Sequence, residues 1–150
     1  MKNIILVVLL FLLNSCGYTS VYKDLGKQDF QITVTDMVGD RDMNNLIKNQ
    51  LAVYSNKNST DKYKVAINTS YKKKVFAKNQ AGVTTDYQIS VNSIFKILTD
   101  NDEREFIFDE KINVKSQTDT FAQNLYERNI KNNFASTLKE KLIAEILALK

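Results

Sequence analysis

Apolar and polar residues alternate in four stretches of this chain, which is the pattern of half-buried β-strands. The first stretch is short and has Phe30, Ile32 and Val34 as its apolar positions, and the second runs over residues 63–76. The other two follow a hairpin connection at residues 77–82 and a tight turn at residues 100–102. Their apolar positions are Tyr87, Ile89, Val91, Phe95 and Ile97 in the third strand, and Phe106, Phe108, Ile112 and Val114 in the fourth.

Two further stretches have apolar residues three and four positions apart, which predicts amphipathic helices. The first covers residues 42–54, after a turn that offers acidic N-cap candidates. The second runs from Thr120 to Leu149 after a capping stretch at residues 116–120, in which Thr120 has capping-box spacing to Gln123. The predicted apolar stripe of this long helix is Phe121, Leu125, Tyr126, Ile130, Phe134, Leu138, Leu142, Ile146 and Leu149.

The predicted order of elements is therefore β-α-β-β-β-α. A strand, a helix and a strand indicate a crossover unit, and the last three strands indicate an antiparallel meander. We expect an α+β fold, a two-layer sandwich with two helices on one face of a four-stranded mixed sheet.

Short polar residues dominate the other face of this predicted sheet. Such a face is either an ordinary solvated surface or a surface that lies in a confined aqueous space. The residues expected there are Thr33, Thr35, Asn68, Ser70, Gln88, Ser90 and Asn92.

The N-terminus has the layout of a bacterial lipoprotein signal. Lys2 precedes an apolar run at residues 4–13 that is too short to span a bilayer comfortably, and Ser15 stands just before Cys16. An ordinary secretory signal or a membrane anchor, with a chance cysteine, is the alternative. The lipoprotein interpretation divides the chain into a signal peptide (1–15), a lipid-anchored tether (16–27) and a single α/β sandwich domain (28–150).

Lipidation would attach a diacylglycerol and an N-acyl chain to Cys16, and several acyl chains hold a protein at a membrane firmly. Gly17 follows the cysteine, where an Asp would retain many lipoproteins in the inner membrane. We therefore expect the outer membrane, on its periplasmic side. Because Cys16 is the only cysteine, the domain has no internal disulfide and must be stabilised by an ordinary hydrophobic core.

Candidate catalytic groups are scarce. The chain has no histidine, its one cysteine is assigned to lipid, and it lacks phosphate-binding and nucleophile-elbow motifs. Asp100, Asp102 and Glu103 are best explained by turn chemistry, although an anchored enzyme that uses carboxylates remains an alternative. We expect a non-enzymatic protein with no cofactor. The formal net charge of +4 does not by itself indicate a nucleic-acid partner.

Lys72, Lys73, Lys74 and Lys78 surround the predicted hairpin between the second and third strands. Lysines at a strand end commonly serve solubility and protect the sheet edge. The alternative is a binding site for a phosphate-rich amphiphile such as lipopolysaccharide (LPS), whose phosphates would pair with ammonium groups.

Three segments, taken in order, resemble a known family. Residues 16–22 open with Cys-Gly and an aromatic, residues 39–51 enter a helix through Asp-Arg, and residues 82–87 lead into a long strand before Phe121-Ala122 opens the last helix. This order is similar to the LPS-assembly lipoprotein family LptE in its alphaproteobacterial-like form, over nearly the whole chain. A Pro that the family often has near its start is missing here.

The resemblance implies an outer-membrane lipoprotein that plugs the lumen of the LptD β-barrel and helps deliver LPS to the cell surface. It also implies a fold of two helices on a four-stranded sheet. The expected partners are an LptD-like barrel, LPS and the membrane, with no nucleic acid. A lipoprotein subunit of another envelope machine, such as barrel assembly or peptidoglycan-synthase activation, remains the alternative.

Overall fold

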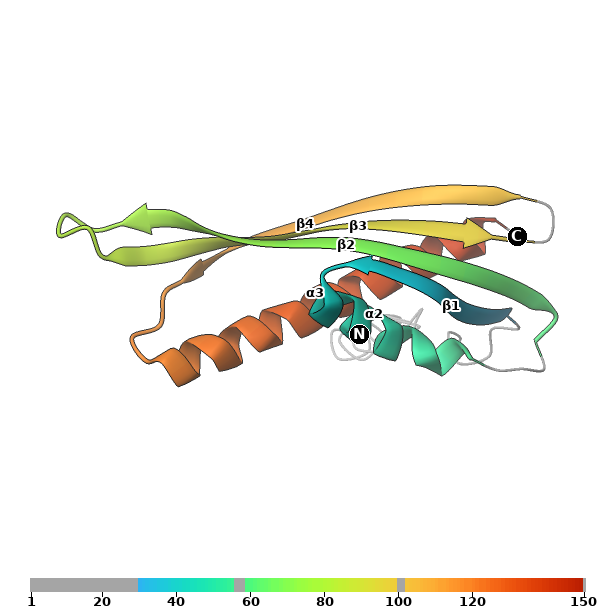
Figure 1. Ribbon diagram of the computed structural model, residues 1–150, viewed down its shortest axis with the longest axis horizontal. Helices are drawn as coiled ribbons and strands as arrows, with labels where there is room; N and C mark the ends of the chain where they lie inside the picture. The colour runs from blue at the N-terminus through green and yellow to red at the C-terminus, as the bar shows by residue number, and fades with distance from the viewer. Residues whose placement is uncertain (1–29, 56–58, 100–101, 150) are drawn as a thin grey trace, which may run out of the picture.

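A computed structural model describes residues 30–55, 59–99 and 102–149. Cys16, the tether and Asp100 lie outside this part of the chain. The elements are β1 (Phe30–Gly39), α2 (Arg41–Leu51), a short 3-10 helix η4 (Ala52–Tyr54), β2 (Asp61–Lys78), β3 (Thr84–Leu98), β4 (Glu103–Lys115) and α3 (Thr120–Ala148). Figure 1 shows this order, and it confirms the predicted β-α-β-β-β-α arrangement.

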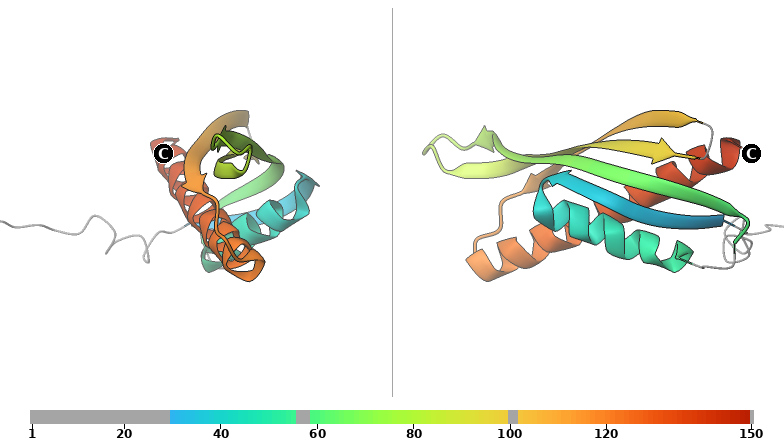
Figure 2. Two further views of the ribbon diagram at one scale, coloured as in Figure 1. Left: turned by 90° about the vertical axis from the view of Figure 1, so that its left-hand side faces the viewer. Right: turned by 45° about the vertical axis from the view of Figure 1, so that its right-hand side comes forward.

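The four strands form one mixed sheet in the order β1-β2-β3-β4. β1 and β2 are parallel and are joined through α2, whereas β2, β3 and β4 form an antiparallel meander. Both helices lie on the same side of the sheet, which makes two layers (Figure 2). The opposite side of the sheet has no helix over it in the described part of the chain, and we call it the open face.

The hydrophobic core fills the space between the sheet and the two helices. Met43, Ile47 and Leu51 bury one side of α2, as their helical spacing predicts. The sheet contributes the inward-facing residues of every strand, including Val65, Ile67, Ile89, Val91, Phe95 and Ile97. From Ile130 onward, α3 contributes Ile130, Phe134, Leu138, Leu142 and Ile146, all from the predicted stripe.

A close contact between two backbones forms the corner where β1 turns into α2. Gly39 has a φ of +90°, and a Cβ atom at this position would lie 1.9 Å from the carbonyl oxygen of Thr69 in β2. The next residue, Asp40, donates its N–H to that same oxygen at 2.9 Å, and its carboxylate caps α2 by accepting from the N–H of Met43 at 2.9 Å. Only glycine fits this approach.

A buried polar chain stabilises the same corner. The Thr69 hydroxyl donates to the amide oxygen of Asn44 at 2.8 Å, and the amide nitrogen of Asn44 donates to the carbonyl of Val38 at 2.8 Å. Thr69 and Asn44 are both almost fully buried. Because each polar group has a partner, burial carries little penalty, and β1, α2 and β2 are fixed to one another.

The start of α3 differs from the prediction in two respects. Asp119, and not Thr120, is the N-cap, because its carboxylate accepts from the N–H of Ala122 at 2.7 Å. Phe121, Leu125 and Tyr126 are 76%, 48% and 38% exposed, so these three are not core residues. A helix of 3.6 residues per turn places Phe121 and Leu125 on the side opposite Ile130 and Phe134.

Thr35 is another difference, because it does not continue the alternation of β1. The register with β2 shifts between Val34 and Asp36, so Thr35 is the extra residue of a β-bulge. Its hydroxyl donates to the carbonyl of Val65 at 3.4 Å. The other short polar residues predicted for the open face lie on it by register, from Thr33 on β1 to Gln88, Ser90 and Asn92 on β3.

The corner gives a prediction that compares two glycines with positive φ. We expect Gly82→Ala in the β2–β3 hairpin to lower the free energy of unfolding by about 1–2 kcal/mol, since it adds only backbone strain. Gly39→Ala adds a collision with the Thr69 carbonyl and should cost more than about 3 kcal/mol. Chemical denaturation of both variants measures the difference, and equal losses would show that the corner is not tightly packed.

Candidate functional site on the open face

Alternation along β2 separates three consecutive lysines. Residues 65, 67 and 69 are buried against the helices, so Lys73 lies on the helix side and Lys72 and Lys74 lie on the open face. The prediction of one group of four lysines is therefore divided between the two faces. Lys78, its fourth member, ends β2 beside the hairpin turn, beyond two register shifts.

Two lysines of β4 complete the group on the open face. Ser90 of β3 pairs with Lys72 on one side and with Lys111 on the other, so these three form a row across the sheet. The row beside it is Lys74, Gln88 and Asn113, and the next contains Asp86 and Lys115. Strands are about 4.8 Å apart and alternate residues about 7 Å apart, which places the backbones of Lys72 and Lys111 roughly 10 Å from each other.

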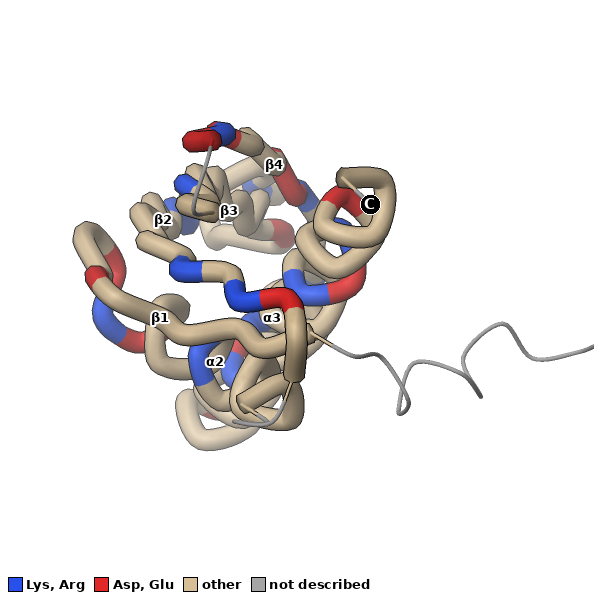
Figure 3. Tube along the Cα trace, turned by 90° about the vertical axis from the view of Figure 1, so that its right-hand side faces the viewer, with Lys and Arg blue, Asp and Glu red and all other residues tan. Residues whose placement is uncertain are grey.

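We call Lys72, Lys74, Lys111 and Lys115 the open-face basic surface. Among the described residues, none of these four forms an ion pair, whereas Lys73, Lys96, Lys131, Lys139 and Lys141 all do. Asp109, a nearby acidic residue, accepts a hydrogen bond from Asn92 at 2.9 Å. Charges of both signs are spread over strands and helices (Figure 3), so what distinguishes this surface is the grouping of four lysines in adjoining rows of one sheet face.

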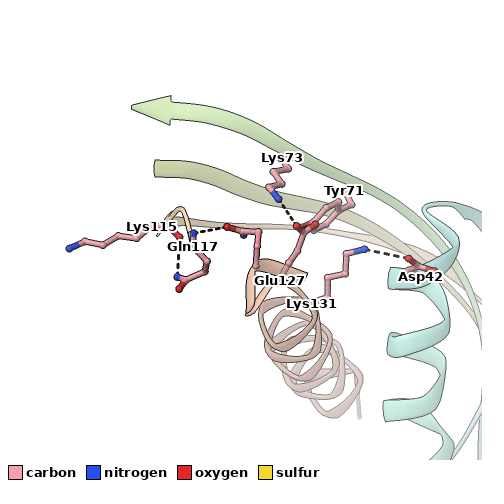
Figure 4. A network of polar contacts seen from close by, with 8 residues as sticks. Asp42, Tyr71, Lys73, Lys115, Gln117, Glu127 and Lys131 are labelled. Carbon is pink, nitrogen blue, oxygen red and sulfur yellow. Dashed lines mark hydrogen bonds and ion pairs between the residues drawn. The ribbon is translucent and has the colours of Figure 1, made fainter. Parts of the chain in front are cut away.

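Lys73 has a structural role on the other side of the sheet. Its ammonium group lies 2.6 Å from a carboxylate oxygen of Glu127 on α3 and 4.5 Å from the centre of the Tyr87 ring. The hydroxyl of Tyr71 donates to the same carboxylate at 2.7 Å, so Glu127 joins β2 to the first half of α3 (Figure 4).

The titration of this cluster follows from its contacts. Burial alone would raise the pKa of Glu127, but hydrogen bonds from Lys73 and Tyr71 and the charges of Lys73 and Lys131 lower it below its ordinary value. Burial, together with the hydrogen bond to Glu127, raises the pKa of Tyr71 strongly. The Glu127 carboxylate is therefore held in its charged form.

Lys111 and Lys115 were not among the lysines predicted from the sequence. Their partners lie on β3, and only the pairing register of β3 with β4 shows that they lie beside Lys72 and Lys74. The alternation of Phe106 and Phe108 with Ile107 and Asp109 was the available signal, because it assigns odd-numbered residues of β4 to the open face.

Of the carboxylates considered as an alternative site, Asp102 forms an ion pair with Arg104, two residues further along the chain. The Nε–H of Arg104 donates a hydrogen bond to Oδ2 of Asp102 at 2.7 Å, and this bond lowers the pKa of Asp102. The described residues contain no group of three His, Cys, Asp or Glu side chains that could hold a metal ion. None of the described helices is long and apolar enough to cross a membrane.

Several solved structures with the same fold are bacterial lipoproteins. Rare lipoprotein B from Shewanella oneidensis superimposes with a TM-score of 0.58 at 8% identity, covering 78% of this chain and 96% of its own. A putative lipoprotein from Caulobacter crescentus has a TM-score of 0.56 at 14% identity, and the match covers 83% of this chain and 91% of the other. Lipoprotein B from Nitrosomonas europaea has a TM-score of 0.50 at 8% identity, and the match covers 79% of this chain and 86% of the other.

These similarities establish a shared fold over most of each chain. No protein-family model matches the sequence, and no curated protein matches it either. This chain thus shares its fold with these bacterial lipoproteins, at sequence identities of 8–14%.

The Glu127 cluster predicts a pH dependence. A carboxylate with a lowered pKa stabilises the fold above the ordinary Glu value of about 4.3, and this stability is lost as pH falls further through the folded-state pKa. Glu127→Gln should remove that acid-sensitive part and cost about 1 kcal/mol or less at neutral pH. Urea unfolding from about pH 3 to about pH 7 measures both effects.

Glu145→Gln is a suitable control, because Glu145 is on the same helix and forms no ion pair among the described residues. It should retain the acid-sensitive loss of the wild type. If Glu127→Gln loses stability with acid in the same way as the wild type, the cluster does not stabilise the fold.

Proposed function

We propose that this protein is an outer-membrane lipoprotein that plugs and stabilises an LptD-like β-barrel and assists the assembly of lipopolysaccharide at the cell surface. It acts by binding and catalyses no reaction. The observation that carries the proposal is the open-face basic surface, four lysines without ion pairs among the described residues, on a sheet face that none of the described helices covers.

The chemistry of this surface suits the phosphate groups of LPS. Ammonium groups form short, charge-assisted hydrogen bonds with phosphate oxygens. Ser90 lies between Lys72 and Lys111, and Gln88 and Asn113 occupy the adjoining row, so hydroxyl and amide donors stand between the cations. Lys73 is left out of this proposed set because Glu127 already neutralises it, whereas Lys78 at the hairpin stays as a peripheral contact.

The shape of the molecule supports the role of a plug. The β2–β3 hairpin extends beyond α2 as a long arm, and β1 begins at the opposite end of the molecule (Figure 1). Phe30, which begins β1, is the first described residue after Cys16. The arm and the basic surface would then reach away from the membrane anchor, into the polar interior of a barrel.

The lipoprotein assignment has two sources of support. Cys16 directly follows the signal-like N-terminus, and several solved structures with this fold are bacterial lipoproteins. The order of the three LptE-like segments supports the more specific proposal of a role in LPS assembly.

A charge-removal variant tests the contact with LPS. The full-length lipidated protein carrying Lys72→Gln, Lys74→Gln, Lys111→Gln and Lys115→Gln should bind purified LPS at least about tenfold more weakly than the wild type, a change of roughly 1.4 kcal/mol. The difference should shrink at high salt, because screening weakens the wild-type contacts.

The matched control removes four lysines from other positions. Lys62 and Lys64 are on the far end of the open face, and Lys48 and Lys139 are on the helices. Changing these four to Gln alters net charge equally and should leave LPS binding nearly unchanged. Equal losses in both variants would mean that LPS responds only to overall charge.

A further inference from the structure

We infer that a groove between α2 and α3 binds an acidic side chain of a partner polypeptide. The groove is in the helix layer, on the side of the sheet opposite the open-face basic surface, so the inference goes beyond the proposed LPS contact. Its volume is about 450 Å³. The lining residues are Asp42, Asn45 and Leu46 from α2, and Asn124, Glu127, Arg128 and Lys131 from α3.

Both carboxylates of the groove already have cationic partners. Glu127 accepts from Tyr71 and pairs with Lys73. Asp42 lies 3.4 Å from the ammonium group of Lys131, which also rests 4.5 Å from the centre of the Tyr71 ring (Figure 4). These contacts connect the two helices to β2 and give the groove a fixed wall.

Arg128 is the one charged residue lining the groove that has no ion-pair partner among the described residues. Among the described residues it forms no ion pair or side-chain hydrogen bond, although Glu127 and Asp42 line the same groove. Asn124 lies four residues before Arg128 and therefore on the same side of α3, and Asn45 lines the groove from α2. Neither amide has a hydrogen-bond partner in the described structure.

This set of groups selects its ligand by charge and shape. A guanidinium binds a carboxylate or a phosphate through two parallel hydrogen bonds. Because Lys131 and Lys73 already neutralise Asp42 and Glu127, Arg128 leaves the groove with one net positive charge, which matches the single negative charge of a carboxylate.

The rest of the groove suits a polypeptide. Carboxamides on both walls can donate and accept, as the peptide unit requires, and Leu46 offers an apolar contact. A volume of this size accommodates a ligand comparable to a few residues. The occupant is therefore a peptide segment that places one Asp or Glu beside Arg128.

The three arginines of this chain allow a test with internal controls. Arg41, Arg104 and Arg128 each give a side-chain Nε–H signal by nuclear magnetic resonance in the full-length lipidated protein in detergent micelles. The probe is the blocked peptide Gly-Ser-Glu-Ser-Gly, titrated to roughly millimolar concentration. The Arg128 signal should shift in a saturable way while those of Arg41 and Arg104 stay in place.

Three further peptides or solutes identify the source of the anion. The same peptide with Gln should bind at least tenfold more weakly, and the same peptide with phosphoserine should bind more weakly than the Glu peptide. Galacturonate, a free sugar acid, should bind more weakly than the Glu peptide as well. Stronger binding of the phosphopeptide or of galacturonate would overturn the peptide-carboxylate assignment, and so would parallel shifts of all three arginines.

A matched pair of asparagine variants tests the walls of the groove. Asn124→Ala should weaken the Glu peptide at least threefold, whereas Asn129→Ala, at an exposed position on the other side of α3, should not. An unchanged affinity in Asn124→Ala, with the fold retained by circular dichroism, contradicts the proposed geometry.

Discussion

The register of β2 is the constraint on which the rest of the structure depends. Thr69 holds that register at one point, because its carbonyl touches Gly39 and accepts from Asp40, and its hydroxyl binds Asn44. A slip of one residue would move every side chain of β2 to the other face of the sheet. Lys73 would then lose Glu127, and Lys72 and Lys74 would enter the helix side.

That register also determines how the two faces of the sheet divide their roles. On the helix side, Lys73 is neutralised by its partner Glu127 on α3. On the open face, Lys72 and Lys74 form no ion pair with any of the described residues. The same run of three lysines therefore contributes one residue to stability and two to a surface available for binding.

A second feature of the structure is that α3 extends beyond the end of α2. Its first turns contribute little to the core, since Phe121 and Leu125 are exposed. Glu127, through Tyr71 and Lys73, connects this part of the helix to the sheet. Polar contacts replace apolar packing there, and they also shape the groove beside Arg128.

Local patterns were sufficient to predict the elements and their order. The alternation of Tyr63, Val65 and Ile67 and the spacing of Met43, Ile47 and Leu51 reflect burial directly, and both predictions are confirmed. The α+β class followed from the order of these elements.

The predictions were wrong where contacts between distant parts of the chain determine the position or exposure of a residue. Asp119 caps α3 in place of Thr120, and Phe121 is exposed because the helix runs past its neighbours. Lys111 joined the basic surface only through cross-strand register, which a single sequence does not reveal.

The central claim is that this domain works inside an outer-membrane β-barrel. Purification of the tagged full-length protein from its own cells under mild detergent tests that claim most directly. We expect one large outer-membrane β-barrel to be recovered with it in equal amount. Recovery of the lipoprotein without any such barrel would contradict the claim.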